Sequence, residues 1–120
     1  MNSAPSDQDP PPFPAPAEEA RIVLSTAPVG EAEGLARALV EERLAACVNI
    51  VPGVRSCYRW QSTVQNDPET LLIVKTVADR LPTLAARLEE LHPYEVPELL
   101  VLAPDGGSAA YLAWLGASTD

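Results

Sequence analysis

The most reactive-looking stretch of the chain is His-Pro-Tyr-Glu-Val-Pro-Glu, residues 92–98, which holds the only histidine. Imidazole and carboxylate groups together suit Cu(II), Ni(II) or Zn(II), and they suit the softer Cu(I) ion poorly. His92, Glu95 and Glu98 are therefore candidate metal ligands. Neighbours on an extended chain point to opposite sides, so this pattern is a weaker metal signal than a Cys-x-x-Cys pair. Glu95 or Glu98 could complete a site around His92, together with groups from a neighbouring chain. The alternative is that His92 only ends a helix, where imidazole suits the negative end of the helix dipole.

A second candidate site combines aromatic and charged residues from several segments. Lys75 lies within an apolar strand pattern and needs a partner, for which Glu98 is the first candidate. The pair could be a structural ion pair, or it could belong to a polar pocket at a subunit boundary. The residues expected to line that pocket are Tyr58, Trp60, Lys75, His92, Tyr94 and Glu98.

Enzyme motifs are lacking in the sequence. It contains no recognisable arrangement of nucleophile, base and acid, and Gly106-Gly107 is too short to cradle a phosphate group. We therefore expect the protein not to be an enzyme.

The elements that must position these residues follow from periodicity and turn residues. Apolar, β-branched runs predict strands, and apolar positions three and four residues apart predict helices. Pro52-Gly53 should form a bulge or bend, Asp79 should cap the second helix, and Ser108 should cap the third. The predicted order is a strand over 21–27, a helix over 30–46, strands over 47–63 and 69–77 joined by a turn at 65–68, a helix over 79–92, a strand over 97–103 and a helix over 108–118.

This order is β-α-β-β-α-β followed by a helix, which predicts an α+β, ferredoxin-like fold with an antiparallel sheet. The strands are apolar on both faces, but helices can cover only one face. The long hairpin over 47–77 also exceeds the size of a compact domain. Both features predict that the sheet packs against another copy of the chain.

Composition limits the remaining possibilities. The 120 residues suggest one folded domain over 21–119, preceded by a proline-rich segment over 1–20 that we expect to be disordered. The net charge of −9 argues against binding to nucleic acid or to anionic membranes. No apolar run approaches the roughly 18 residues of a membrane span. Cys47 and Cys57 are expected to be free thiols in a reducing cytoplasm.

Four segments are similar to those of a known family: VEERLAACVNIVPGVRSCYRW, LLIVKT, HPYEVPELLVL and YLAWL. In type, order and spacing they resemble the CutA family, the divalent-cation tolerance proteins, over about residues 21–119. The resemblance implies a homotrimer, similar in architecture to the PII signalling proteins, with a role in tolerance of divalent metals, mainly copper.

The sequence departs from that family at positions that matter for ligands. The run Trp60-Gln61-Ser62-Thr63 lacks the Gly-Lys pair usual at the hairpin tip, and Ser25 and Leu91 replace a cysteine and a histidine found in some members. We therefore expect modest binding of Cu(II) or another divalent ion. Two alternatives are a PII-like module that binds a small molecule between subunits, and a scaffolding trimer without a ligand.

Overall fold

The computed structural model describes residues 12–120. None of the helices in this part of the chain is long and apolar enough to cross a membrane. The predicted order of strands and helices is confirmed, with two short strands and one 3-10 turn in addition. The elements are β1 (Ala15–Pro16), β2 (Ala20–Ala27), α1 (Ala32–Glu41), β3 (Cys47–Trp60), β4 (Thr63–Val77), η1 (Ala78–Arg80), α2 (Leu81–Leu91), β5 (Leu100–Leu102), β6 (Gly106–Gly107) and α3 (Ala109–Ser118).

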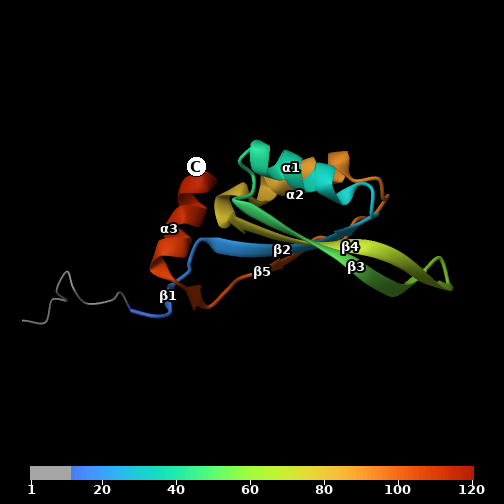
Figure 1. Ribbon diagram of the computed structural model, residues 1–120, viewed down its shortest axis with the longest axis horizontal. Helices are drawn as coiled ribbons and strands as arrows, with labels where there is room; N and C mark the ends of the chain where they lie inside the picture. The colour runs from blue at the N-terminus through green and yellow to red at the C-terminus, as the bar shows by residue number, and fades with distance from the viewer. Residues whose placement is uncertain (1–11) are drawn as a thin grey trace, which may run out of the picture.

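Four strands form an antiparallel sheet in the order β3-β4-β2-β5, which is the ferredoxin-like arrangement. Helices α1 and α2 lie on one face of this sheet (Figure 1). The core between the two layers is formed by buried aliphatic side chains of sheet and helices: Val23, Leu35, Leu39, Leu72, Val74, Leu84 and Leu88.

The opposite face of the sheet is covered by neither α1 nor α2 (Figure 1). Helix α3 packs against one end of this face, at Ala20 and Val77. We call it the helix-free face because α1 and α2 both lie on the other side of the sheet. Strand register places six large aliphatic residues on it: Ile22, Leu24, Leu71, Ile73, Leu100 and Leu102. Leu100 is 59% exposed and Leu102 is 48% exposed, although both are fully apolar side chains. The sequence-based expectation of a sheet that is apolar on both faces is therefore confirmed for the chain itself.

The β3–β4 hairpin extends well beyond the helices (Figure 1). It gives the molecule a longest dimension of 67 Å and a radius of gyration of 17.5 Å, compared with about 13 Å for a compact chain of this length. The hairpin turns at Gln61 and Ser62, whose φ angles are 50° and 67°. The predicted turn at 65–68 is wrong, because these residues lie in β4. Among the described strands, this part of β4 pairs with β3 alone, and Pro68 is tolerated on its open edge.

Helix ends partly follow the prediction. Ser108 caps α3 as expected, and its Oγ accepts a hydrogen bond from the Tyr111 N–H at 3.1 Å. Asp79 makes no capping hydrogen bond; it lies in the 3-10 turn η1 that leads into α2, so the predicted cap is wrong. Helix α1 ends at Glu41 and not near residue 46, because Arg43 adopts a left-handed conformation with φ 60°.

Residues 15–19, which precede β2, take part in the fold. Strand β1 pairs with β6, and Ala17 and Ala20 pack against Leu115 of α3 in a second small core. The disorder predicted for residues 1–20 is therefore wrong for β1 and the residues that follow it, whereas residues 1–11 lie outside the described part. Gly106 permits this pairing, because a Cβ there would lie 2.6 Å from the Ala15 carbonyl oxygen.

Candidate functional site

His92 is buried at the end of α2, and both of its ring nitrogens are used. Nδ1 accepts a hydrogen bond from the Tyr94 N–H at 3.1 Å, so it carries no proton. Nε2 therefore carries the proton, and this N–H donates a hydrogen bond to the Thr26 carbonyl oxygen at 2.7 Å. A metal ligand needs a free lone pair, which this neutral ring does not offer. The structure thus gives His92 a structural role in joining the loop after α2 to the end of β2, and the predicted metal-ligand role does not fit.

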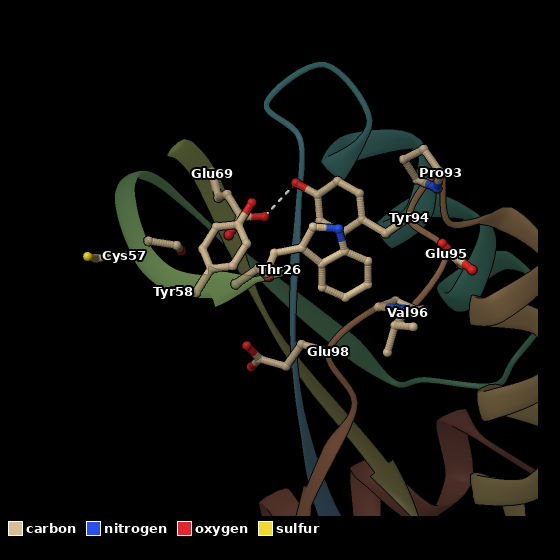
Figure 2. Close-up of a pocket in the computed structure, with 12 residues that line it drawn as sticks. Thr26, Cys57, Tyr58, Glu69, Pro93, Tyr94, Glu95, Val96 and Glu98 are labelled. Carbon is tan, nitrogen blue, oxygen red and sulfur yellow. Dashed lines mark hydrogen bonds between the residues drawn. The ribbon is translucent and has the colours of Figure 1, made fainter. Parts of the chain in front are cut away.

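A cavity of about 780 Å³ lies beside this loop (Figure 2). It is formed by the end of β2, the outer half of the β3–β4 hairpin and the loop between α2 and β5. The lining residues are Thr26, Ser56, Cys57, Tyr58, Trp60, Glu69, Pro93, Tyr94, Glu95, Val96, Pro97 and Glu98. We call this cavity the acidic pocket. Four of the six predicted pocket residues line it, whereas Lys75 and His92 do not.

The predicted bulge at Pro52-Gly53 is confirmed, and it decides which residues line the acidic pocket. Val51 pairs with Leu71, but Val54 pairs with Glu69, so two residues of β3 oppose one residue of β4. The extra residue moves the even-numbered positions that follow onto the helix-free face. Tyr58 and Trp60 therefore lie on the same face as Glu69. Gly53 has φ 78°, a conformation that glycine adopts without strain.

Two tyrosines donate short hydrogen bonds to carboxylates at this site. The Tyr94 hydroxyl donates to Glu69 Oε2 at 2.6 Å, as Figure 2 shows. The Tyr58 hydroxyl donates to Asp67 Oδ2 at 2.6 Å. Burial and the contact with Glu69 raise the pKa of Tyr94, and the hydrogen bond to Asp67 raises the pKa of Tyr58. Both phenols therefore stay protonated and neutral near pH 7.

The predicted carboxylate ligands do not converge. Glu95 and Glu98 point in different directions on either side of Val96 (Figure 2). Across residues 12–120, no three His, Cys, Asp or Glu side chains cluster closely enough to hold a metal ion. One chain therefore does not supply the ligand set predicted from His92, Glu95 and Glu98.

Lys75 lies at the other end of the sheet from the acidic pocket. Its register partners are Cys47 and Ile22, whereas Glu98 precedes β5 and lines the acidic pocket together with Thr26. Ile22 and Thr26 are four residues apart on β2, or roughly 13 Å. The ion pairs among the described residues do not include Lys75. The predicted pair of Lys75 with Glu98 within one chain is therefore wrong.

Sequence reasoning missed Glu69 and Asp67, the two carboxylates bonded to the tyrosines. Glu69 begins an apolar strand pattern, and Asp67 lies in what looked like a turn. Only the correct hairpin register, with Ser56 opposite Asp67, would have placed them beside Tyr58. That register depends on the bulge and on a turn of two non-glycine residues, which carries a weak sequence signal.

The acidic pocket has a strongly one-sided charge. Glu69, Glu95 and Glu98 line it, Asp67 lies beside it, and none of the described residues that line it is Lys or Arg. A pocket lining with carboxylates and no basic side chain favours a positively charged ligand, and it disfavours an anion such as a nucleotide phosphate.

Comparison with known proteins agrees with this architecture. Residues 21–118 match the family described as CutA1 divalent ion tolerance protein. A relative from Thermus thermophilus, named divalent-cation tolerance protein CutA, is 54% identical over 99 residues, which cover 82% of this chain and 96% of the relative.

Solved structures give the same result. The divalent cation tolerance protein (Cut A1) of Thermus thermophilus has a TM-score of 0.81 at 51% identity, covering 84% of this chain and 99% of that one. The PII-like protein CutA from Nostoc sp. PCC 7120 has a TM-score of 0.80 at 36% identity, covering 83% of this chain and 97% of that one. The chain belongs to the CutA family of divalent-cation tolerance proteins.

Proposed function

We propose that this protein acts in divalent-cation tolerance as a cytoplasmic homotrimer that binds divalent cations and catalyses no reaction. The observation that carries the proposal is the acidic pocket, which is lined by Glu69, Glu95 and Glu98 and, among the described residues, by no Lys or Arg. Two free cysteines, Cys47 and Cys57, are consistent with a reducing compartment.

The helix-free face supports self-association. Its six aliphatic residues form a patch on a sheet that neither α1 nor α2 covers. Contiguous apolar patches of this kind usually mark an interaction surface. The projecting β3–β4 hairpin provides a means of reaching a neighbouring chain. The number three comes from the resemblance of the sequence to the CutA family.

Metal binding is proposed to require the assembly. Because the carboxylates of one chain do not converge, Glu95 or Glu98 would need ligands from a neighbouring chain to complete a site for Cu(II) or a similar ion. His92 is not among the proposed ligands, because its nitrogens are already hydrogen-bonded.

Two measurements test the proposal. Light scattering behind size-exclusion chromatography should give the mass of three chains, and a mass of one chain at micromolar concentration would contradict the association. Calorimetric titration with Cu²⁺ should then compare the wild type with the double variant Glu95→Gln/Glu98→Gln. The matched control is Glu31→Gln/Glu33→Gln, which removes the same charge from exposed positions at the start of α1.

We expect the pocket variant to bind copper at least about tenfold more weakly than the control variant, a difference of about 1.4 kcal/mol. Equal binding by both variants would show that the ion binds elsewhere or responds only to net charge. The control is needed because the chain already carries a net charge of −9.

The second candidate function is that of a PII-like module that binds a small molecule. It is favoured by the size of the acidic pocket, since a cavity of about 780 Å³ exceeds what one metal ion needs and falls within the usual range for small-molecule sites. The absence of Lys and Arg from the described pocket lining argues against an anionic ligand in that module.

A further inference from the structure

Helix α3 is attached to the rest of the chain by little apolar contact. Of the residues Ala109–Ser118, only Leu115 is buried, and the main core formed by described residues includes none of them. Leu115 packs in the second small core, whose other buried members are Ala17, Ala20 and Ala46. Alanines bury little apolar area, and a helix of 10 residues is marginal in water by itself. Other contacts must therefore hold α3 in place.

The segment before β2 holds α3 at its N-terminal end. We call residues 15–19 the strap. At its start, β1 pairs with Gly106-Gly107, which lie immediately before the Ser108 cap of α3. Ala17 then packs against Leu115 in the second small core. In Figure 1, β1 lies beside the start of α3, at the opposite end of the molecule from the hairpin tip.

Hydrogen bonds fix the strap to the end of the sheet. The Glu19 carbonyl oxygen accepts a hydrogen bond from the Ala78 N–H, which follows β4, at 2.8 Å. The Glu18 carbonyl oxygen accepts one from Arg21 Nη1, also at 2.8 Å. The strap is therefore connected both to the sheet and to the first turn of α3, so it restrains the helix relative to the sheet.

Two arginines hold the other end of α3. Arg43 donates hydrogen bonds to the carbonyl oxygens of Ala117 and Asp120, both at 2.9 Å. Arg80 donates one to the Thr119 carbonyl oxygen at 2.7 Å. The last carbonyl oxygens of a helix have no partner within the helix, so guanidinium groups stabilise them. These contacts fix the last turn of α3, whereas the first turn depends on the strap.

We infer that the strap is a latch for α3. While the strap is paired with β6, α3 stays docked; when the strap is released, α3 undocks and unfolds as one local unit. Elements with few buried apolar contacts open in this way before the core does. The family match begins at residue 21, so the latch is an addition that lies outside the family domain.

The latch also affects the proposed association surface. Because α3 packs at Ala20 and Val77, its release uncovers two further apolar residues at one end of the helix-free face. The strap thus determines how far this face extends. That consequence rests on the proposed self-association, whereas the latch itself depends neither on metal binding nor on the number of chains.

Hydrogen exchange of the full chain, measured by peptide-resolved mass spectrometry, tests the latch. In the variant Gly106→Ala, the added Cβ would lie 2.6 Å from the Ala15 carbonyl oxygen and so displaces the strap. Its matched control is Gly107→Ala, in which the Cβ would meet Leu112 Cδ2 at 3.5 Å, an ordinary contact.

A second variant, Ala17→Asp, places a charge in the second small core without a backbone clash. Its control is Ala86→Asp, at an exposed position of α2. Circular dichroism and light scattering at one protein concentration report the fold and the mass of each variant.

In the wild type, we expect the α3 amides to exchange at least about tenfold faster than those of residues 71–75 of β4, which pair with strands on both sides. Exchange in α3 should also depend less on added urea, because a local opening exposes less surface than global unfolding does. Gly106→Ala and Ala17→Asp should each speed α3 exchange at least about tenfold, whereas each control should change it less than about twofold.

Three results would overturn the inference. The first is wild-type α3 exchange as slow as that of β4, because α3 would then open only with the core. The second is unchanged α3 exchange in Gly106→Ala or Ala17→Asp, and the third is an equal rise in their controls. A wild-type mass of one chain together with the expected exchange rates would support the latch and contradict only the proposed self-association.

Discussion

Two buried residues on neighbouring strands carry hydroxyl groups whose removal should change the free energy of unfolding in opposite directions. Ser25 on β2 and Thr76 on β4 are both fully buried. Thr76 Oγ1 donates a hydrogen bond to the Leu44 carbonyl oxygen at 2.6 Å. In contrast, Ser25 Oγ has no partner within residues 12–120. The same chemical group is thus satisfied at one site and unsatisfied at the other.

The expected magnitudes follow from this difference. A buried polar group without a partner costs about 1–3 kcal/mol, and Ser25→Ala removes that cost with the loss of a single atom. We expect the free energy of unfolding to rise by about 1 kcal/mol. Thr76→Val removes a formed hydrogen bond and deprives the Leu44 carbonyl of its donor, so the free energy of unfolding should fall by about 1–2 kcal/mol.

Urea unfolding of both variants measures these changes. Protein concentration must be held fixed, because association shifts apparent stability by mass action. In a thermal scan the two variants should differ by several degrees, with Ser25→Ala above the wild type and Thr76→Val below it. If Ser25→Ala loses as much stability as Thr76→Val, Ser25 has a partner in solution and the reasoning is refuted.

Three further outcomes are expected. Gly106→Ala should lower the free energy of unfolding by about 1–3 kcal/mol, because the added Cβ clashes with the Ala15 carbonyl oxygen. The control Gly34→Ala, which has open space around it, should be neutral or raise the free energy of unfolding by up to about 1 kcal/mol. Equal effects of the two substitutions would contradict the β1–β6 pairing. The pKa of Tyr94 is raised in the folded state by burial and by its contact with a carboxylate, so the stability present below about pH 10 should be lost as the pH rises through the raised value. In urea unfolding measured between pH 9 and 11, Tyr94→Phe should therefore lose less stability with rising pH than the wild type does. An unchanged pH profile would contradict this expectation. Lys75→Met should change stability by less than about 0.5 kcal/mol, because no ion pair within the described chain includes this lysine; a large loss would indicate a carboxylate from a neighbouring chain.

The order of elements could be predicted because each depends on local pattern. Helix α2 follows from leucines at helical spacing, and the cap at Ser108 follows from the side chain of one residue. The bulge at Pro52-Gly53 was predictable for the same reason, since proline and glycine act on their own backbone. The errors at Asp79 and at residues 65–68 occurred where good local signals were overridden by a 3-10 turn and by strand pairing.

The acidic pocket could be predicted only in part. Tyr58, Trp60, Tyr94 and Glu98 were placed together correctly, but Lys75 and His92 do not line the pocket and Glu69 was missed. The composition of the sequence determined that the protein is acidic, and its periodicity determined that the sheet is apolar on both faces. Only the tertiary structure decided which carboxylates meet which aromatic rings. The reason is physical: one residue of register, set by the bulge, moves every following side chain of β3 to the other face, and the hydrogen bonds that hold His92 come from residues far away in the chain.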